Sequence, residues 1–513
     1  MTDTATGRWT SSRLVLAVTR NTAVFWIVLV AVFVLARLAA WGFPYDSDHW
    51  IFYYVGRNWI VEGGDLYVDA WDHKPPMIFL MNGIMAALLG GDIVLHRIWL
   101  TAFAVLDAWL FHLLAKRVLP GLLEGVRSRI DPVVAVRLSL LLYVFLRNLS
   151  QFTNSGNNTE AYGVVLVLLL VLAFLKFTGG GAWWWLSLAG LACGVLFWFK
   201  GNFLIFGAAI GILLLVQGWR RPGRLILHVL AYIAPIVLVA LAWFAYFAAR
   251  GTFDDFWIAS FSFSAAYASS AWGGTVSSNI WLFIITAALF IPALVFFALY
   301  LRDARAQWRS PNYLLVGAMF LAGALLIGIV GSFYAFYLLI MMPFIVLVIM
   351  YGMLRLGSLG AVLRNVLILG FIATLVVNYA FSTRQLLNTF TGAAQQDAIE
   401  QRQAAEYVRE HTEPGERIFA NQYGATFYQL ADRRSASRFT SASWLLLDYR
   451  DGFGFGFNDI FIEEMEKNRA PYVVVGASTA ELYAENTQLD EYFAEHFQQV
   501  EAFGDTIVLE RVK

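Results

Sequence analysis

The strongest constraint in this sequence is a series of apolar stretches, each close to the length of a membrane-spanning helix. A helix needs roughly 20 apolar residues to cross a bilayer. Eleven segments reach or approach that length: 21–43, 95–115, 132–149, 160–177, 182–199, 201–217, 225–249, 279–301, 313–331, 334–354 and 361–381. With 59% hydrophobic and 14% charged residues, the chain differs sharply from soluble domains. A soluble enzyme is excluded, and we expect a polytopic α-helical membrane protein.

The distribution of positive charge orients these predicted spans. Segment 75–89 opens with Pro75-Pro76, ends at Gly90-Gly91 and is short, so we assign it to the membrane interface. The inner loops then hold sixteen Lys and Arg, against seven in the outer loops before the tail, as the positive-inside tendency favours. Segment 21–43 is too long for a signal peptide and reads as an uncleaved first span. We therefore expect eleven spans, a cytoplasmic N-terminus and an extracytoplasmic tail.

Charge also separates the tail from the membrane part. Residues 393–513 carry 21 acidic and 11 basic side chains, whereas the preceding part carries 15 and 25. Polar and apolar patterns in the tail predict a helix followed by short strands, at 395–411, 417–420, 472–475 and 506–512. The sequence thus predicts a transmembrane domain over 1–392 with an outer loop at 44–75, and a small soluble α/β domain over 393–513.

The first outer loop concentrates carboxylates at one membrane face. It holds Asp46, Asp48, Glu62, Asp65, Asp69 and Asp72, opposed only by Arg57 and Lys74. Asp46 and Asp48 follow the predicted first span within five residues, where a rigid helix end can position a general base. The pattern alone fits equally well a solvated acidic loop whose aspartates cap a helix.

Lys74 stands directly before Pro75-Pro76, at the start of the predicted interfacial segment. An ammonium group there can meet a lipid phosphate, and such a charge-assisted hydrogen bond contributes about 1.5–3 kcal/mol. The alternative is a lysine whose stem lies along apolar surface while its charge reaches water.

The loop resembles that of a known family. The strings 45–48 (YDSD) and 71–77 (WDHKPPM) are similar to the first outer loop of bacterial C-type (GT-C) membrane glycosyltransferases. The branch that they resemble contains protein O-mannosyltransferases and lipid A aminoarabinose transferases. The resemblance implies an inverting transferase in which Asp46 is the general base and Lys74 lies near the donor phosphate, with Asp48 as a weaker catalytic match.

A second element of the resemblance is the string 157–160 (NNTE) at the outer start of the fourth span, which makes Glu160 a catalytic candidate. A carboxylate favoured by a helix dipole is the simpler interpretation. The remaining substrate-binding candidates are His73, Arg37, Arg97, Lys200 and Tyr267.

Each of these candidates also has a structural interpretation. A charge inside a membrane costs about 2.5–3.5 kcal/mol, so Arg37 and Lys200 are expected to be functional or paired. Arg97 fits an interfacial anchor. Tyr267 lies in an aromatic-rich outer loop, where its ring can stack on a sugar or belong to an interfacial belt.

The resemblance implies no obligatory cofactor. A divalent metal held by His49, His73, Asp46 and Asp48 is conceivable from ligand chemistry, but the spacing matches no strong motif. No nucleic-acid partner is expected. The expected partners are the bilayer, a polyprenyl-phosphate-linked sugar and a glycan, lipid or protein acceptor.

These features favour a glycosyltransferase that uses a polyprenyl-phosphate sugar at the outer face of the membrane, since the chain has no glycine-rich phosphate loop for a nucleotide. The main alternative is a transporter or flippase of lipid-linked sugars. Only Asp107 lies deep in a predicted span, and no internal repeat is visible, which disfavours that alternative. A polysaccharide polymerase or ligase is a third possibility.

Overall fold

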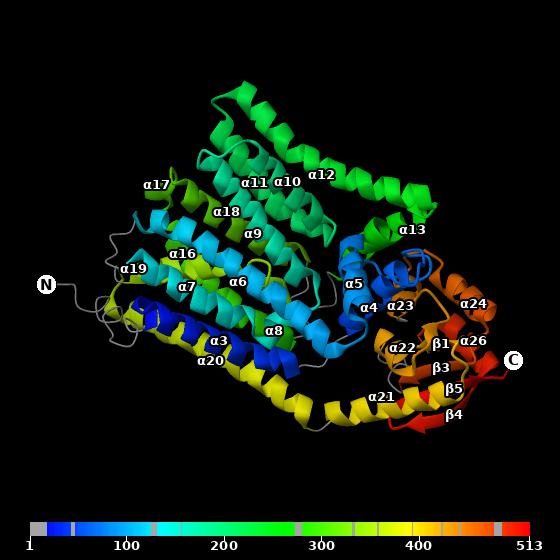
Figure 1. Cartoon of the computed structure of the whole chain (residues 1–513). Helices are drawn as coiled ribbons and strands as arrows, with labels where there is room; N and C mark the ends of the chain where they lie inside the picture. Colours follow the sequence, from blue (N-terminus) through cyan, green and yellow to red (C-terminus); the bar gives the residue numbers. More distant parts are fainter. Residues whose placement is uncertain are drawn as a thin grey trace. The chain divides into compact units, whose positions relative to one another are not determined.

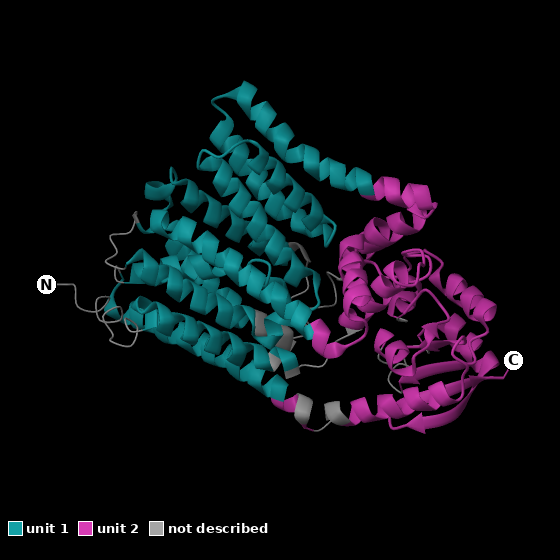
Figure 2. Ribbon diagram, in the orientation of Figure 1, with its two compact units in different colours: residues 1–43, 97–242, 272–386 teal, residues 44–96, 243–271, 387–513 magenta. Residues whose placement is uncertain are grey.

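The computed structural model describes residues 18–42, 47–124, 131–154, 156–271, 280–330, 334–356, 359–391, 393–421, 424–440, 443–476 and 485–512 (Figure 1). The chain divides into two compact units (Figure 2). Unit 1 comprises residues 1–43, 97–242 and 272–386, and unit 2 comprises 44–96, 243–271 and 387–513.

Unit 1 is built from helices. They are α3 (Thr22–Gly42), most of α6 (Ile93–Glu124), α7 (Pro132–Arg147), α8 (Ser150–Thr153), α9 (Thr159–Thr178), α10 (Trp184–Phe197), the 3-10 turn η1 (Gly201–Phe203), α11 (Leu204–Gly218), most of α12 (Pro222–Arg250), α16 (Ile280–Leu301), α17 (Ala304–Gln307), α18 (Pro311–Val330), the 3-10 turn η3 (Ala335–Leu338), α19 (Met342–Arg355) and most of α20 (Ala361–Phe390). Each of the eleven apolar segments predicted from the sequence overlaps one of these helices.

Six helical segments in the described part of the chain are long and apolar enough to cross a membrane: 93–123, 159–178, 201–218, 222–250, 311–328 and 361–388. Shorter apolar helices cover 22–38, 76–89, 184–197, 287–301 and 342–355. A multi-pass helical membrane protein is therefore confirmed, while the number of spans stays a prediction.

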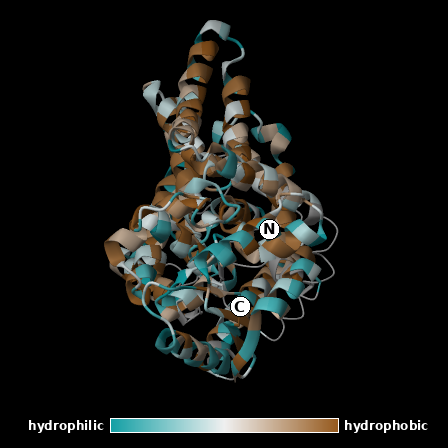
Figure 3. Ribbon diagram, turned by 90° about the vertical axis from the view of Figure 1, so that its right-hand side faces the viewer, coloured by the Kyte–Doolittle hydropathy of each residue, from teal (hydrophilic) through white to brown (hydrophobic). Residues whose placement is uncertain are grey.

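Helix α12 shows why this unit needs lipid around it. Ile226, Leu227, Leu230 and Leu238 are all more than half exposed, and only 6% of the most apolar window of this helix is buried within the chain. Helices α11 and α12, which rise to the top of Figure 3, are brown along most of their length. An apolar surface this large is unfavourable in water and suits the hydrocarbon of a bilayer.

Unit 2 combines the first outer loop, a middle segment and the tail. The loop contains α4 (Ser47–Ile60) and α5 (Pro76–Leu89), and the middle segment contains α13 (Phe253–Trp257), the π-helix η2 (Ile258–Phe263) and α14 (Ser264–Ala271). Helices α4 and α5 pack backbone to backbone, because a Cβ on Gly56 would come within 2.5 Å of the Phe79 carbonyl oxygen. Helix α5 coincides with the predicted interfacial segment.

The tail is the small α/β domain expected from the sequence. Its helices are α21 (Ala393–Glu410), α22 (Ala425–Ala431), α23 (Ser443–Arg450), α24 (Phe457–Asn468) and α26 (Thr487–His496), and its strands are β1 (Arg417–Ala420), β2 (Arg434–Ser435), β3 (Tyr472–Gly476), β4 (Phe497–Phe503) and β5 (Thr506–Arg511). The strand order is β2-β1-β3-β5-β4. Strand β1 is parallel to β2 and β3, and β5 is antiparallel to β3 and β4.

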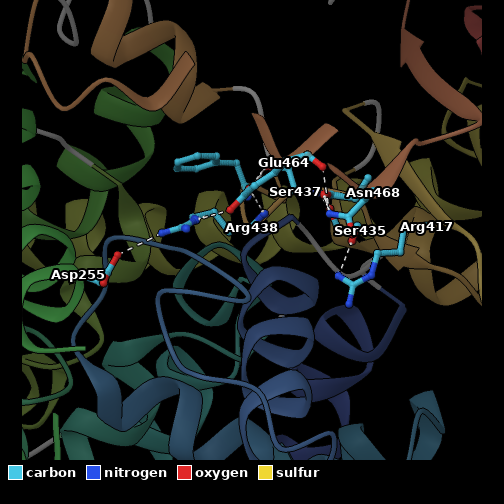
Figure 4. A network of polar contacts seen from close by, with 9 residues as sticks. Asp255, Arg417, Ser435, Ser437, Arg438, Glu464 and Asn468 are labelled. Carbon is cyan, nitrogen blue, oxygen red and sulfur yellow. Dashed lines mark hydrogen bonds and ion pairs between the residues drawn. The ribbon is translucent and has the colours of Figure 1, made fainter. Parts of the chain in front are cut away.

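Within unit 2, polar contacts join the tail to the loop and the middle segment. The Trp71 amide donates to the Arg438 carbonyl at 2.8 Å, and the Ser435 amide donates to the Tyr54 hydroxyl at 2.8 Å. The Arg438 guanidinium lies between Asp255 at 3.1 Å and Glu464 at 2.6 Å (Figure 4). Segments that are distant in the sequence are thus held together by specific bonds.

Candidate active site

Two aspartates that follow the predicted first span, Asp46 and Asp48, are predicted catalytic carboxylates, and the structure describes only the second. Asp46 lies outside the described residues, so its catalytic role stays a prediction. Asp48 lies in the first turn of α4 and is partly exposed. Its charge acts on the carboxyl group of Asp72, which the sequence analysis did not single out as a site residue.

A tight bend in the loop presents His73 and Lys74 side by side. Tyr67, which is buried, adopts a left-handed backbone conformation with φ 72°, and its hydroxyl donates to the Lys74 carbonyl at 2.8 Å. The Lys74 amide donates to Asp72 Oδ1 at 3.1 Å, and Ser264 Oγ donates to the His73 carbonyl at 2.9 Å. These three hydrogen bonds come from the loop itself and from Ser264 of the middle segment.

The side chains of Asp72, His73 and Lys74 form a short polar chain. Lys74 Nζ lies 2.8 Å from His73 Nε2, and His73 Nδ1 lies 3.7 Å from Asp72 Oδ1. An ammonium group has only donors, so Nε2 accepts and the imidazole is neutral, with its hydrogen on Nδ1. The predicted candidates His73 and Lys74 are thus brought together, with Asp72 behind them.

Burial raises the pKa of the Asp72 carboxyl to about 6. The side chain is 2% exposed, and loss of hydration is the largest cause of the shift. The Lys74 charge opposes the shift, and the Asp48 charge adds to it. This carboxylate is therefore held in a site that favours its protonated form.

This raised pKa predicts a pH-dependent stability difference for Asp72→Asn. A folded-state pKa above the ordinary value of 3.8 means that ionised Asp72 destabilises the fold, and this cost grows as pH rises from about 4 and is complete above 6. The variant should therefore be more stable than the wild type by about 3 kcal/mol at pH 7.5 and by ~1 kcal/mol near pH 4.5. Thermal unfolding in detergent at both pH values measures the difference.

Asp65→Asn is the control, because it breaks an exposed ion pair with Arg250 in the same loop. We expect a small effect of similar size at both pH values for this control. A pH-independent gain in Asp72→Asn would contradict the assignment.

Tyr267, on α14, also lies at this site. Its ring centre is 5.4 Å from that of His73, and the Trp444 ring centre, contributed by the tail, is 4.5 Å from His73. The aromatic-rich sequence of its segment is the reason that Tyr267 was a predicted substrate-binding residue. Trp444 was missed, since nothing in a local pattern connects residue 444 to residue 73.

Unit 1 contains its own buried charges. Glu160, at the start of α9, is 1% exposed, and Lys200 Nζ donates to it at 2.9 Å. Thr159 Oγ1 donates to the other carboxylate oxygen at 2.9 Å. Lys200 Nζ also lies 4.0 Å from the centre of the Tyr337 ring. The expectation that Lys200 is functional or paired is met by pairing with another candidate.

The two remaining arginine candidates lie in unit 1 at different positions. Arg37 is buried on α3, and a Cβ on Gly156 would be 3.5 Å from its Nη2 atom. This places the guanidinium beside the segment that leads into Glu160. Arg97 is partly exposed on α6, and its carbonyl accepts a hydrogen bond from Thr101 at 2.7 Å.

The structure adds a buried ion pair that the sequence analysis did not predict. Arg147, at the end of α7, donates from both Nε and Nη2 to Asp107 Oδ2 on α6 at 2.7 Å. Tyr143 donates to the other oxygen at 3.2 Å. Both charged side chains are at most 1% exposed. The sequence located Asp107 in a span and gave no signal for its partner.

Metal binding was considered for His49, His73, Asp46 and Asp48. Over the residues that the structure describes, which leave out Asp46, no three His, Cys, Asp or Glu side chains are grouped to hold a metal ion. The His73 side chain shares a hydrogen bond with Lys74 and packs beside the rings of Tyr267 and Trp444.

The fold defines a class: a multi-pass helical membrane protein with a small α/β tail. Among solved structures, the crystal structure of ArnT from Cupriavidus metallidurans bound to undecaprenyl phosphate has a TM-score of 0.59 with this chain, at 15% identity over 95% of this chain and 98% of ArnT. The apo structure of the same ArnT gives 0.59 and 16% over the same shares. The resemblance to lipid A aminoarabinose transferases is thus confirmed at the level of the fold.

The likeness is one of structure. No protein-family model matches the chain, and no curated protein sequence matches it. With 15% identity, the fold is shared along nearly the whole chain while most side chains differ.

Proposed function

We propose that this protein is an inverting glycosyltransferase that moves a sugar from a polyprenyl-phosphate donor to an acceptor at the outer face of the membrane. The observation that carries the proposal is the Lys74 ammonium, fixed at the N-terminal end of α5 by its bond to His73, in a fold whose solved example ArnT binds undecaprenyl phosphate. The N-terminus is then cytoplasmic, and the tail is extracytoplasmic.

Lys74 suits the leaving phosphate. An ammonium group has three donors, and in the described part of the chain one of them is directed at His73. The other two can bind phosphate oxygens. Because the negative charge of the phosphate grows as the sugar departs, a cation fixed in advance stabilises the transition state more than the bound donor.

In the proposed step, an acceptor hydroxyl oxygen attacks the anomeric carbon from the face opposite the phosphate. The bond from this carbon to the phosphate oxygen breaks, and its electron pair leaves with the polyprenyl phosphate. The hydroxyl proton passes to Asp46. Attack from the opposite face inverts the anomeric configuration.

The other candidates receive supporting roles in this proposal. The Asp48 charge helps to raise the pKa of the Asp72 carboxyl, and His73 orients the Lys74 ammonium. In unit 1, we assign the Glu160–Lys200 pair to polar groups of a substrate and the Arg37 and Arg97 guanidinium groups to anionic ones, with no obligatory metal.

The decisive experiment incubates the purified full chain in lipid nanodiscs with radiolabelled polyprenyl-phosphate sugars, with and without a chelator. We expect at least one donor to release polyprenyl phosphate in both conditions. Lys74→Gln should lower kcat/KM by roughly 10–100-fold, as expected for loss of a charge-assisted bond of about 1.5–3 kcal/mol.

Lys176→Gln is the matched control. It removes a lysine from the last turn of α9, and Lys176 has no role in the proposed reaction. Its turnover should equal that of the wild type. Movement of intact lipid-linked sugars across a vesicle membrane, without bond cleavage, would favour the flippase alternative and contradict the proposal.

A further inference from the structure

We propose that the soluble tail supplies a substrate-binding residue, Trp444, which together with Tyr267 forms an aromatic wall for the sugar ring of the lipid-linked donor. This inference rests on the proposed function, since it specifies where the sugar lies once the phosphate is on Lys74. Trp444 belongs to α23, more than 350 residues from Lys74 in the sequence but within the same unit.

Three rings meet next to the Lys74 ammonium. The ring centre of His73 is 4.5 Å from that of Trp444 and 5.4 Å from that of Tyr267, and the latter two are 6.3 Å apart. His73 also holds Lys74 Nζ at 2.8 Å. In a sugar phosphate, a single oxygen joins the ring to phosphorus. A phosphate on Lys74 therefore places the sugar close to His73 and to the two rings that pack beside it.

Trp444 lies at the border of an aromatic core. Its neighbours Trp71, Phe263 and Phe457 are fully buried and pack against one another, with ring centres 4.9–5.5 Å apart. Trp444 contacts Trp71 at 6.2 Å and Phe263 at 5.8 Å, yet it remains partly exposed. One side of the indole packs on the core, and another part remains accessible.

The indole N–H of Trp444 supplies a second, independent observation. Among the described residues, this buried Nε1 atom has no hydrogen-bond acceptor. A buried donor without a partner is unfavourable, and buried tryptophans normally satisfy this group. A sugar hydroxyl that reaches the edge of the ring can accept from this N–H, while the exposed part of the indole covers apolar C–H groups of the sugar.

The position of Trp444 is fixed by its own helix and by the chain that follows. The Asp448 carboxylate, buried one turn later on α23, accepts hydrogen bonds from the Phe455 amide at 2.8 Å and the Phe457 amide at 2.9 Å. The bridge from Asp255 through Arg438 to Glu464 fixes the tail against the segment that carries Tyr267 (Figure 4). The indole is therefore set in place before a substrate binds.

The test compares two ligands on the full chain in nanodiscs by titration calorimetry: undecaprenyl phosphate and the undecaprenyl-phosphate sugar found active above, or a hexose derivative if none is active. We expect Trp444→Leu to raise the Kd of the sugar-bearing lipid about tenfold and to leave the Kd of undecaprenyl phosphate unchanged. Trp444→Phe, which keeps a ring but loses the N–H, should fall between the wild type and the leucine variant. KM should rise more than kcat falls.

Phe453→Leu is the matched control, because Phe453 packs on Phe263 at 5.5 Å within the same aromatic cluster. It should reproduce any loss of thermal stability without the selective loss of sugar affinity. Equal weakening of both ligands by Trp444→Leu, or no weakening of either, overturns the inference. If the variant weakens only the sugar-bearing lipid while no donor is ever cleaved, the inference holds and the proposed transferase function fails.

Discussion

Replacing Asp46 with asparagine is expected to lower the rate of sugar transfer by roughly 10²–10⁴-fold, the range typical for loss of a general base. The amide keeps the size of the side chain but cannot take the proton of the attacking hydroxyl. Donor binding, measured with undecaprenyl phosphate, should stay within about twofold of the wild type, because the phosphate is assigned to Lys74. The transfer rate with a saturating acceptor is the measurement.

Asp65→Asn provides the comparison for this prediction. It removes one carboxylate from the same loop, where Asp65 forms an exposed pair with Arg250. Its transfer rate should match that of the wild type. Full activity of Asp46→Asn would end the assignment of the base. If Asp48→Asn lost activity instead, Asp48 would be the general base.

Arg147→Met is expected to destabilise the protein by about 3–5 kcal/mol, which is a large fraction of the free energy of unfolding of a typical protein. Methionine fills a similar volume but leaves the Asp107 carboxylate buried without its cation, since both groups are at most 1% exposed. The fraction of monodisperse protein after detergent extraction and the unfolding temperature are the measurements.

The double variant Asp107→Leu, Arg147→Met should recover most of this loss, because replacing both partners of a buried pair by apolar groups is often neutral or stabilising. Arg250→Met serves as the exposed counterpart. Its bond to Asp65 is solvated, so we expect a much smaller loss of stability than for Arg147→Met. A stable Arg147→Met single variant would show that the pair contributes little to the fold.

The helices and part of the sheet followed from local sequence. Apolar length alone located a helix in each of the eleven segments, and Pro75-Pro76 correctly opened α5. Apolar runs revealed β1, β3 and β5. Strand β4 was not predicted, because its sequence FQQVEAF has no continuous apolar run and lies mostly exposed, and it forms a strand by pairing along β5. Tertiary pairing overrides local preference in such strands.

The site was predictable only where its residues are neighbours in sequence. His73 and Lys74 came from one string, and the structure joins them by a hydrogen bond. By contrast, Asp107 and Arg147 lie on two different helices that pack together. Trp444 contacts His73 although hundreds of residues separate them in the sequence. Spacing in a single sequence carries no signal for such contacts.

The assembly of unit 2 from three separated segments has a consequence for biogenesis. Residues 44–96 leave the ribosome first, whereas the tail that bonds to Trp71 and Tyr54 is synthesised last. In the proposed topology, a nascent chain carries its lysine-bearing bend across the membrane long before the partners of that bend exist. The proposed site is then complete only after the final 120 or so residues have been synthesised and exported.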